Sequence, residues 1–172
     1  MESLKIYKVS EQYIRYLNSR DSKVQFNKNA RRPYVGVVFT FGRFKYFVPM
    51  ESPKPNHKNI KSGKHILKLD GGLYGMLGFN NMIPVHNDAL IEFDINAEPD
   101  EKYKRLLQHQ AELCNRKKAD ILNHAQMTYF DVTSGNNKFL VNISCDFKKL
   151  EKACREYKKD FKPNEKSKKT AK

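Results

Sequence analysis

The stretch "YVGVVFTFGRFKYFVP", residues 34–49, contains two runs of β-branched and aromatic residues with Gly42 and Arg43 between them. Such residues are enriched in strands, and two runs joined by two residues that include a glycine are typical of a β-hairpin. The stretch therefore predicts a hairpin over residues 34–48, around which a sheet can assemble.

Further strands are predicted on both sides of this hairpin. In "SLKIYKV" (3–9), Leu4 and Ile6 alternate with Lys5, as in a half-buried strand. Downstream, short apolar runs bounded by Gly, Asp or Asn predict strands at 65–69, 73–79, 80–85 and 89–95. A set of about six short strands at this spacing is typical of a small barrel.

Helices are predicted before and after these strands. Ser10 is a residue type that caps helices, and Tyr13, Ile14 and Leu17 share one face of a helix over residues 10–21. Apolar residues at intervals of three and four predict two more helices at 101–125 and 146–161, with a strand at 138–144 between them.

These elements together predict an α+β fold with about three helices in one domain, residues 1–161. The tail, residues 162–172, has five lysines and one glutamate and no core-forming residues, so it is expected to be basic and disordered.

The net charge of the chain is +14, and residues 1–161 retain +10 of it because the tail carries +4. A folded domain this basic is typical of a protein that binds a polyanion such as nucleic acid. The alternative is a surface that is basic only for solubility.

The composition also indicates the cellular compartment of the protein and whether it needs a cofactor. Three cysteines without a C-x-x-C pair argue against a disulfide framework and a structural zinc site, and they suit a reducing cytosol. No signal peptide and no bilayer-spanning stretch is recognisable, so a cytoplasmic protein with no membrane partner is expected. The five histidines are scattered and no paired carboxylates or phosphate loop is seen, so no metal and no cofactor is expected.

The hairpin is followed by "MESPKPNHK", residues 50–58, in which Pro53 and Pro55, with Pro49 before them, fix φ around Ser52 and Lys54. Cleavage of RNA without a metal uses the 2′-OH of the substrate as nucleophile. The enzyme then needs fixed cations, hydrogen-bond donors and groups that move protons, and this segment offers them. An ordinary proline-rich connection after a strand is the alternative interpretation.

Six blocks of the chain resemble, in order and spacing, the endoribonuclease toxins of type III toxin–antitoxin systems, the ToxN-like group that includes AbiQ-like proteins. The blocks are "IYKVSEQYIRYL" (6–17), "DSKV" (21–24), "RRPYVGVV" (31–38), "YFVPMESPK" (46–54), "NNMIPV" (80–85) and "CDFKKLEKACREYKKDF" (145–161).

The resemblance implies a small Kid/MazF-like β-barrel with extra helices, acting as a metal-independent, sequence-preferring endoribonuclease. It implies cleavage by 2′-OH attack to 2′,3′-cyclic phosphate and 5′-OH ends. It also implies an antitoxin made of RNA pseudoknot repeats and a ring-like toxin–RNA assembly that is held mainly through RNA. The substrate would be cellular or phage RNA, and the role would be bacterial growth arrest and phage defence.

The resemblance assigns catalytic roles to Ser52, Lys54, Tyr13 and Arg32. Ser52 would orient the phosphate or relay a proton, while Lys54 and Arg32 would stabilise the phosphorane. The chain departs from the family where Arg32 replaces a lysine found in some relatives, and where Glu51 replaces a frequent threonine. Glu51 is either an extra proton acceptor or a side chain that is turned outward.

Cations and aromatic residues around this segment are predicted to bind RNA. Loop cations can follow a phosphate backbone, and exposed rings can stack on unpaired bases. The predicted RNA-binding residues are Lys23, Phe26, Lys28, Arg31, Tyr34, Glu51, His57, Lys58 and Lys61, with Lys64 extending the basic surface. The alternative function is a non-catalytic basic RNA-binding protein that docks a structured RNA.

Overall fold

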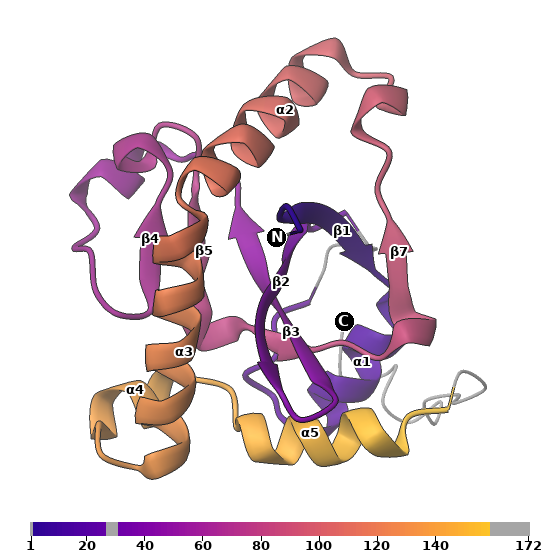
Figure 1. Cartoon of the computed structure of the whole chain (residues 1–172), viewed down its shortest axis with the longest axis vertical. Coiled ribbons are helices and arrows are strands. Elements are labelled where there is room, and N and C mark those ends of the chain that lie inside the picture. The colour runs from indigo at the N-terminus through magenta and orange to yellow at the C-terminus, as the bar shows by residue number, and fades with distance from the viewer. Residues whose placement is uncertain (1, 27–30, 159–172) are drawn as a thin grey trace.

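The predicted hairpin forms the centre of the sheet in the computed structural model, which describes residues 2–26 and 31–158 (Figure 1). Strands β2 (Tyr34–Phe41) and β3 (Phe44–Glu51) pair antiparallel, from Tyr34 opposite Pro49 to Phe41 opposite Phe44. Gly42 turns the chain with φ +57°, a value that glycine adopts without strain. The hairpin prediction is confirmed.

The other strands extend this hairpin on both sides in the order β4-β5-β3-β2-β1-β7, while β6 pairs with β3. Every described pair of neighbours is antiparallel, and the strands lie inside the predicted runs but are shorter. Their bounds are β1 Lys5–Val9, β4 Ile66–Lys68, β5 Met76–Gly78, β6 Ile83–Pro84 and β7 Leu90–Glu92. No pairing among the described residues joins β4 to β7, so the sheet is open and a closed barrel is not what they form.

The first helix lies where it was predicted, and the last begins there but ends earlier, because Tyr157 is extended. Helix α1 (Glu11–Arg20) begins after Ser10, whose hydroxyl accepts from the Tyr13 N–H at 3.3 Å. Helix α5 is Phe147–Glu156, and the last residues of the predicted helix, 159–161, lie outside the described residues, as do the predicted tail 162–172 and Lys28. The α+β class is confirmed.

Two predictions between these helices were wrong. The predicted helix 101–125 is two helices, α2 (Glu101–Arg116) and α3 (Lys118–Ser134), because Lys117 leaves helical geometry at φ −100°, ψ 19°. The predicted strand 138–144 is a short helix, α4 (Lys138–Ile143), because the Asn137 side chain accepts from the Leu140 N–H and caps it. A short apolar run does not by itself distinguish strand from helix.

Helices α3 and α5 hold the turn end of the hairpin, and Figure 1 shows α5 crossing it. The hydroxyls of Tyr46 and Tyr129 each donate to the Glu151 carboxylate at 2.8 Å, and Lys148 pairs with Glu151 at 3.4 Å. This buried carboxylate is therefore satisfied by partners from three elements. The opposite end of the hairpin, where β2 begins and β3 ends, carries the predicted site.

Within the described ranges, no helix combines the length and the apolar character that a membrane span requires.

Candidate functional site

Ser52 and Lys54 lie on an exposed segment at the point where β3 leaves the sheet. Met50 and Glu51 still pair with Leu77 and Met76 of β5. Beyond the segment, the His57 N–H donates to the Lys54 carbonyl at 3.0 Å and begins a turn of 3-10 helix, η1 (Pro55–Asn59). The two predicted catalytic residues are thus presented to solvent on a short connection whose ends are both fixed by backbone hydrogen bonds.

Glycines of the run "DGGLYG" (70–75) pack against the back of this segment. Gly75 has φ +98°, and a Cβ added there would overlap the Glu51 carbonyl oxygen. Gly72 also has φ +98°, and its Cβ would lie 3.0 Å from that of His57. From the sequence, Gly72 is expected in a turn and Gly75 in a bent strand, but their contact with the Ser52 segment is not expected, although dense glycine is a signal of close backbone approach.

Arg32 is brought to the same end of the hairpin. The Met50 N–H donates to the Pro33 carbonyl at 3.0 Å, so the ladder continues beyond Tyr34 and places Arg32 next to the end of β3. Arg32 is half-buried, and its Nε donates to the Phe26 carbonyl at 3.3 Å. Phe26 keeps 55% of its surface exposed, as a base-stacking residue would.

Two predicted tyrosines have no access to substrate. Tyr13 is fully buried and donates its hydroxyl to the Pro84 carbonyl at 2.6 Å. Pro84 pairs with Tyr46 of β3, six residues before Ser52 and therefore about 20 Å away along the strand. Tyr34 is 1% exposed, so it cannot stack on a base, and burial raises the pKa of both phenols above its ordinary value. The structure does not bring Tyr13 together with Ser52.

His57 and Glu51, predicted as RNA contacts, face each other. His57 is 1% exposed, and its Nε2 lies 3.6 Å from Glu51 Oε2. The Glu51 side chain keeps 29% of its surface, so it is half-buried rather than turned outward. A buried histidine cannot contact RNA directly in this conformation.

Exposed cations surround the segment. Lys54, Lys58, Lys61 and Arg31 are exposed, and the Lys68 Nζ donates to the Lys58 carbonyl at 3.3 Å. Other predicted cations already have protein partners. Lys23, although exposed, donates to the Val141 carbonyl at 3.4 Å, and Lys64 pairs with Asp131 at 3.0 Å.

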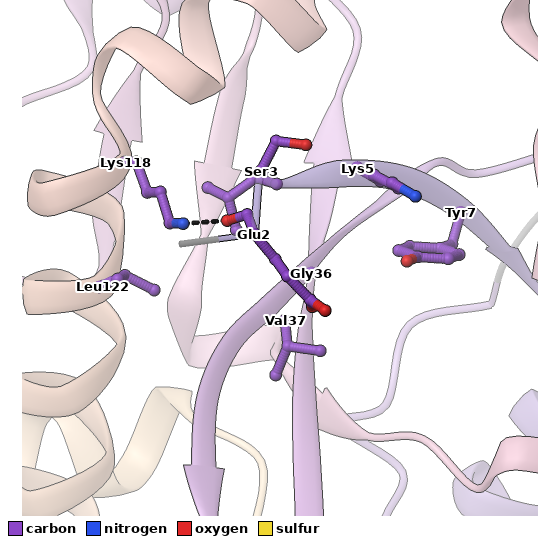
Figure 2. Close-up of a pocket in the computed structure, with 9 residues that line it drawn as sticks. Glu2, Ser3, Lys5, Tyr7, Gly36, Val37, Lys118 and Leu122 are labelled. Carbon is purple, nitrogen blue, oxygen red and sulfur yellow. Dashed lines mark hydrogen bonds between the residues drawn. The ribbon is translucent and has the colours of Figure 1, made fainter.

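A separate pocket of about 580 Å³ lies between the N-terminal residues, β2 and α3 (Figure 2). Lys118 reaches the Glu2 carbonyl across it. The lining does not include Ser52, Lys54 or Arg32; it consists of Glu2, Ser3, Leu4, Lys5, Tyr7, Gly36, Val37, Lys118 and Leu122. In the part of the chain that the structure describes, no three His, Cys, Asp or Glu side chains gather as metal ligands would.

The chain is similar to a family of known toxins. The model of the family "Toxin ToxN, type III toxin-antitoxin system" matches residues 5–155. Endoribonuclease ToxN of Bacillus thuringiensis subsp. kurstaki is 36% identical over 95% of this chain and 89% of its own length. Endoribonuclease AbiQ of Lactococcus lactis subsp. lactis is 29% identical over 91% of both chains.

A solved structure from work on selective toxin inhibition by a non-coding RNA pseudoknot has the same fold. It is 35% identical, with a TM-score of 0.81 over 92% of this chain and 99% of that one. Family model, relatives and fold agree over nearly the whole chain, and the chain therefore belongs to the ToxN family of toxins from type III toxin–antitoxin systems.

Proposed function

We propose that this protein is an endoribonuclease toxin of a type III toxin–antitoxin system, and that it cuts RNA at the segment around Ser52. The relatives that cover almost the full chain are named endoribonucleases, and AbiQ is described as an anti-phage enzyme. The observation that carries the proposal is the exposed Ser52–Lys54 segment, fixed at both ends beside Arg32, in a chain of this family. Growth arrest and phage defence follow as the cellular role.

The chemistry that suits these residues is cleavage by the RNA itself. The 2′-oxygen attacks the adjacent phosphorus as its proton leaves, the bond from phosphorus to the 5′-oxygen breaks, and that oxygen takes up a proton. The products are a 2′,3′-cyclic phosphate and a 5′-OH, and no metal takes part. Lys54 and Arg32 stabilise the negative charge of the phosphorane, and Ser52 orients the phosphate or relays a proton.

The partner that restrains this activity is an RNA antitoxin folded as pseudoknot repeats. The solved relatives come from work on a non-coding RNA pseudoknot and on a processed non-coding RNA, which supports an RNA partner. The antitoxin covers the exposed cations around Ser52, including Arg31, Lys58 and Lys61, and so excludes substrate RNA. Repeats that bind successive toxins give a ring-like assembly held mainly through RNA.

Replacing the Ser52 hydroxyl tests the proposal. Ser52→Ala should abolish cleavage of total bacterial RNA while the circular dichroism spectrum and the affinity for RNA stay close to those of the parent. Ser134→Ala, an exposed serine at the end of α3, is the matched control and should cleave like the parent. A Ser52→Ala protein that cleaves RNA at the parent rate would remove Ser52 from the mechanism. A chain that binds RNA but never cleaves it would instead be a non-catalytic RNA-binding protein.

A further inference from the structure

His57 differs from every neighbour in its segment, because it alone among residues 51–59 is buried. The segment is otherwise a half-buried glutamate followed by exposed residues, with prolines and lysines among them. A buried imidazole in an exposed connection is a specific arrangement, and its contacts indicate what it does.

Those contacts fall on both sides of Ser52. The His57 backbone N–H donates to the Lys54 carbonyl at 3.0 Å, which fixes the C-terminal end of the Ser52–Lys54 segment. The His57 ring approaches Glu51 with its Nε2 3.6 Å from Oε2, which places the imidazole against the residue just before Ser52. One residue therefore links the two ends of the connection that carries both predicted catalytic side chains.

His57 is closely packed at the point where its side chain leaves the backbone. Gly72 lies against this point, since a Cβ there would be 3.0 Å from the His57 Cβ and 3.2 Å from its carbonyl carbon. Gly75 packs closely on the other partner, because a Cβ added there would overlap the Glu51 carbonyl oxygen. Two glycines with positive φ thus allow the segment before β5 to approach both members of the pair closely.

Stability alone does not explain a histidine at this position. Its Nδ1 is buried and has no hydrogen-bond partner among the described residues. A buried polar nitrogen without a partner disfavours folding, and an apolar side chain of similar size would avoid that cost. The histidine therefore contributes something other than stability.

We propose that His57 is a positioning residue for RNA cleavage, whose side chain acts through Glu51, beside its backbone hydrogen bond to the Lys54 carbonyl, to hold Ser52 and Lys54 in reactive geometry. The inference rests on the proposed function. Ser52 is the first residue after β3, so a Glu51 that is held against His57 fixes the backbone from which the Ser52 side chain projects. Glu51 is then part of the support for Ser52 and not a proton acceptor for the substrate. The contact at 3.6 Å is longer than a hydrogen bond, and in free enzymes the hydrogen bonds of an active site are often long until substrate binds.

The test compares cleavage rate with RNA affinity. The rate is measured in single turnover on an RNA that the parent protein cleaves, and affinity is measured on a copy of that RNA with 2′-O-methyl groups. His57→Leu should keep its stability and bind the methylated RNA within about twofold of the parent, yet cleave at least about tenfold more slowly. His57→Gln keeps a donor for Glu51 and should recover part of the rate. His109→Leu, at an exposed position in α2, is the matched control and should cleave like the parent.

A double variant shows whether His57 acts through Glu51. Glu51→Ala removes a half-buried side chain, so the protein should fold, and it should lose rate as His57→Leu does. Combining the two changes should cost no more than either alone, because they break one contact. The inference is overturned if His57→Leu cleaves at the parent rate, if rate and RNA affinity fall together, or if the two changes multiply.

The two proposals fail in different ways. If Ser52→Ala stops cleavage while both His57→Leu and Glu51→Ala leave it unchanged, only the positioning role is wrong. If the parent cleaves no RNA, or Ser52→Ala cleaves normally, the proposed function is what fails.

Discussion

The side chains that the sequence assigned to one site differ sharply in burial. Ser52 and Lys54 are exposed, whereas Tyr13, Tyr34 and His57 are almost completely covered. Tyr13 could have been placed inside from the sequence, because it shares a helical face with Ile14 and Leu17. The burial of His57 could not, since it depends on a glycine run that arrives from elsewhere in the chain.

Tyr13 is therefore expected to act in stability and not in catalysis. Tyr13→Phe leaves the Pro84 carbonyl without its hydroxyl donor inside the core, which should lower the free energy of unfolding by about 1–3 kcal/mol. Cleavage per folded molecule should stay near that of the parent. Tyr103→Phe on α2 is the control, and its free energy of unfolding and its cleavage should both stay near those of the parent. The measurement is urea unfolding beside a cleavage assay. Loss of cleavage with an unchanged free energy of unfolding would show that Tyr13 acts in catalysis.

The elements that the sequence predicted well are those with a long and regular pattern. The hairpin and α1 carry turn and cap signals that agree with their apolar periodicity. Helix α1 formed within its predicted range, and the hairpin formed with β3 running three residues beyond the predicted end, to Glu51. Residues 138–144 were misassigned because a short apolar run was given more weight than the capping Asn137. The open edge of the sheet was also not predictable, since strand spacing gives the number of strands and not whether the first meets the last.

The junction of β3 with β5 depends on Gly75. Gly75→Ala should destabilise the protein more than Gly42→Ala does, although both glycines have positive φ, because only at Gly75 would the added Cβ overlap another backbone atom. At Gly42 nothing lies within 4 Å, so the cost there should be about 1–2 kcal/mol from conformation alone. Thermal unfolding of the two variants measures the difference. Equal shifts in melting temperature would mean that the contact with Glu51 is not tight.

At the scale of the whole molecule, burial controls the reactivity of the three free cysteines. Desolvation raises the pKa of the Cys114 and Cys145 thiols from the ordinary 9.0 to about 12. The folded protein therefore binds more protons than the unfolded chain between these values. The stability that the two thiols contribute is fully present below about pH 9 and is lost as pH rises toward about pH 12.

The expected outcome is a steeper alkaline loss of stability in the parent than in a Cys114→Ala/Cys145→Ala variant. Urea unfolding of both proteins from about pH 8 to about pH 10 measures the two slopes. In the same samples, iodoacetamide should modify the native thiols far more slowly than the denatured ones. Parallel slopes together with fast modification of the native protein would show that these thiols are accessible.

The central claim is that the RNA supplies its own nucleophile at the Ser52 segment. It is tested most directly by incubating the protein, in EDTA, with a short RNA that it cleaves and with the same RNA carrying one 2′-O-methyl group at the scissile nucleotide. The account predicts that the unmodified RNA is cut to 2′,3′-cyclic phosphate and 5′-OH ends, and that the methylated RNA stays intact. Cleavage of the methylated RNA, or products that end in a 3′-OH, would contradict it.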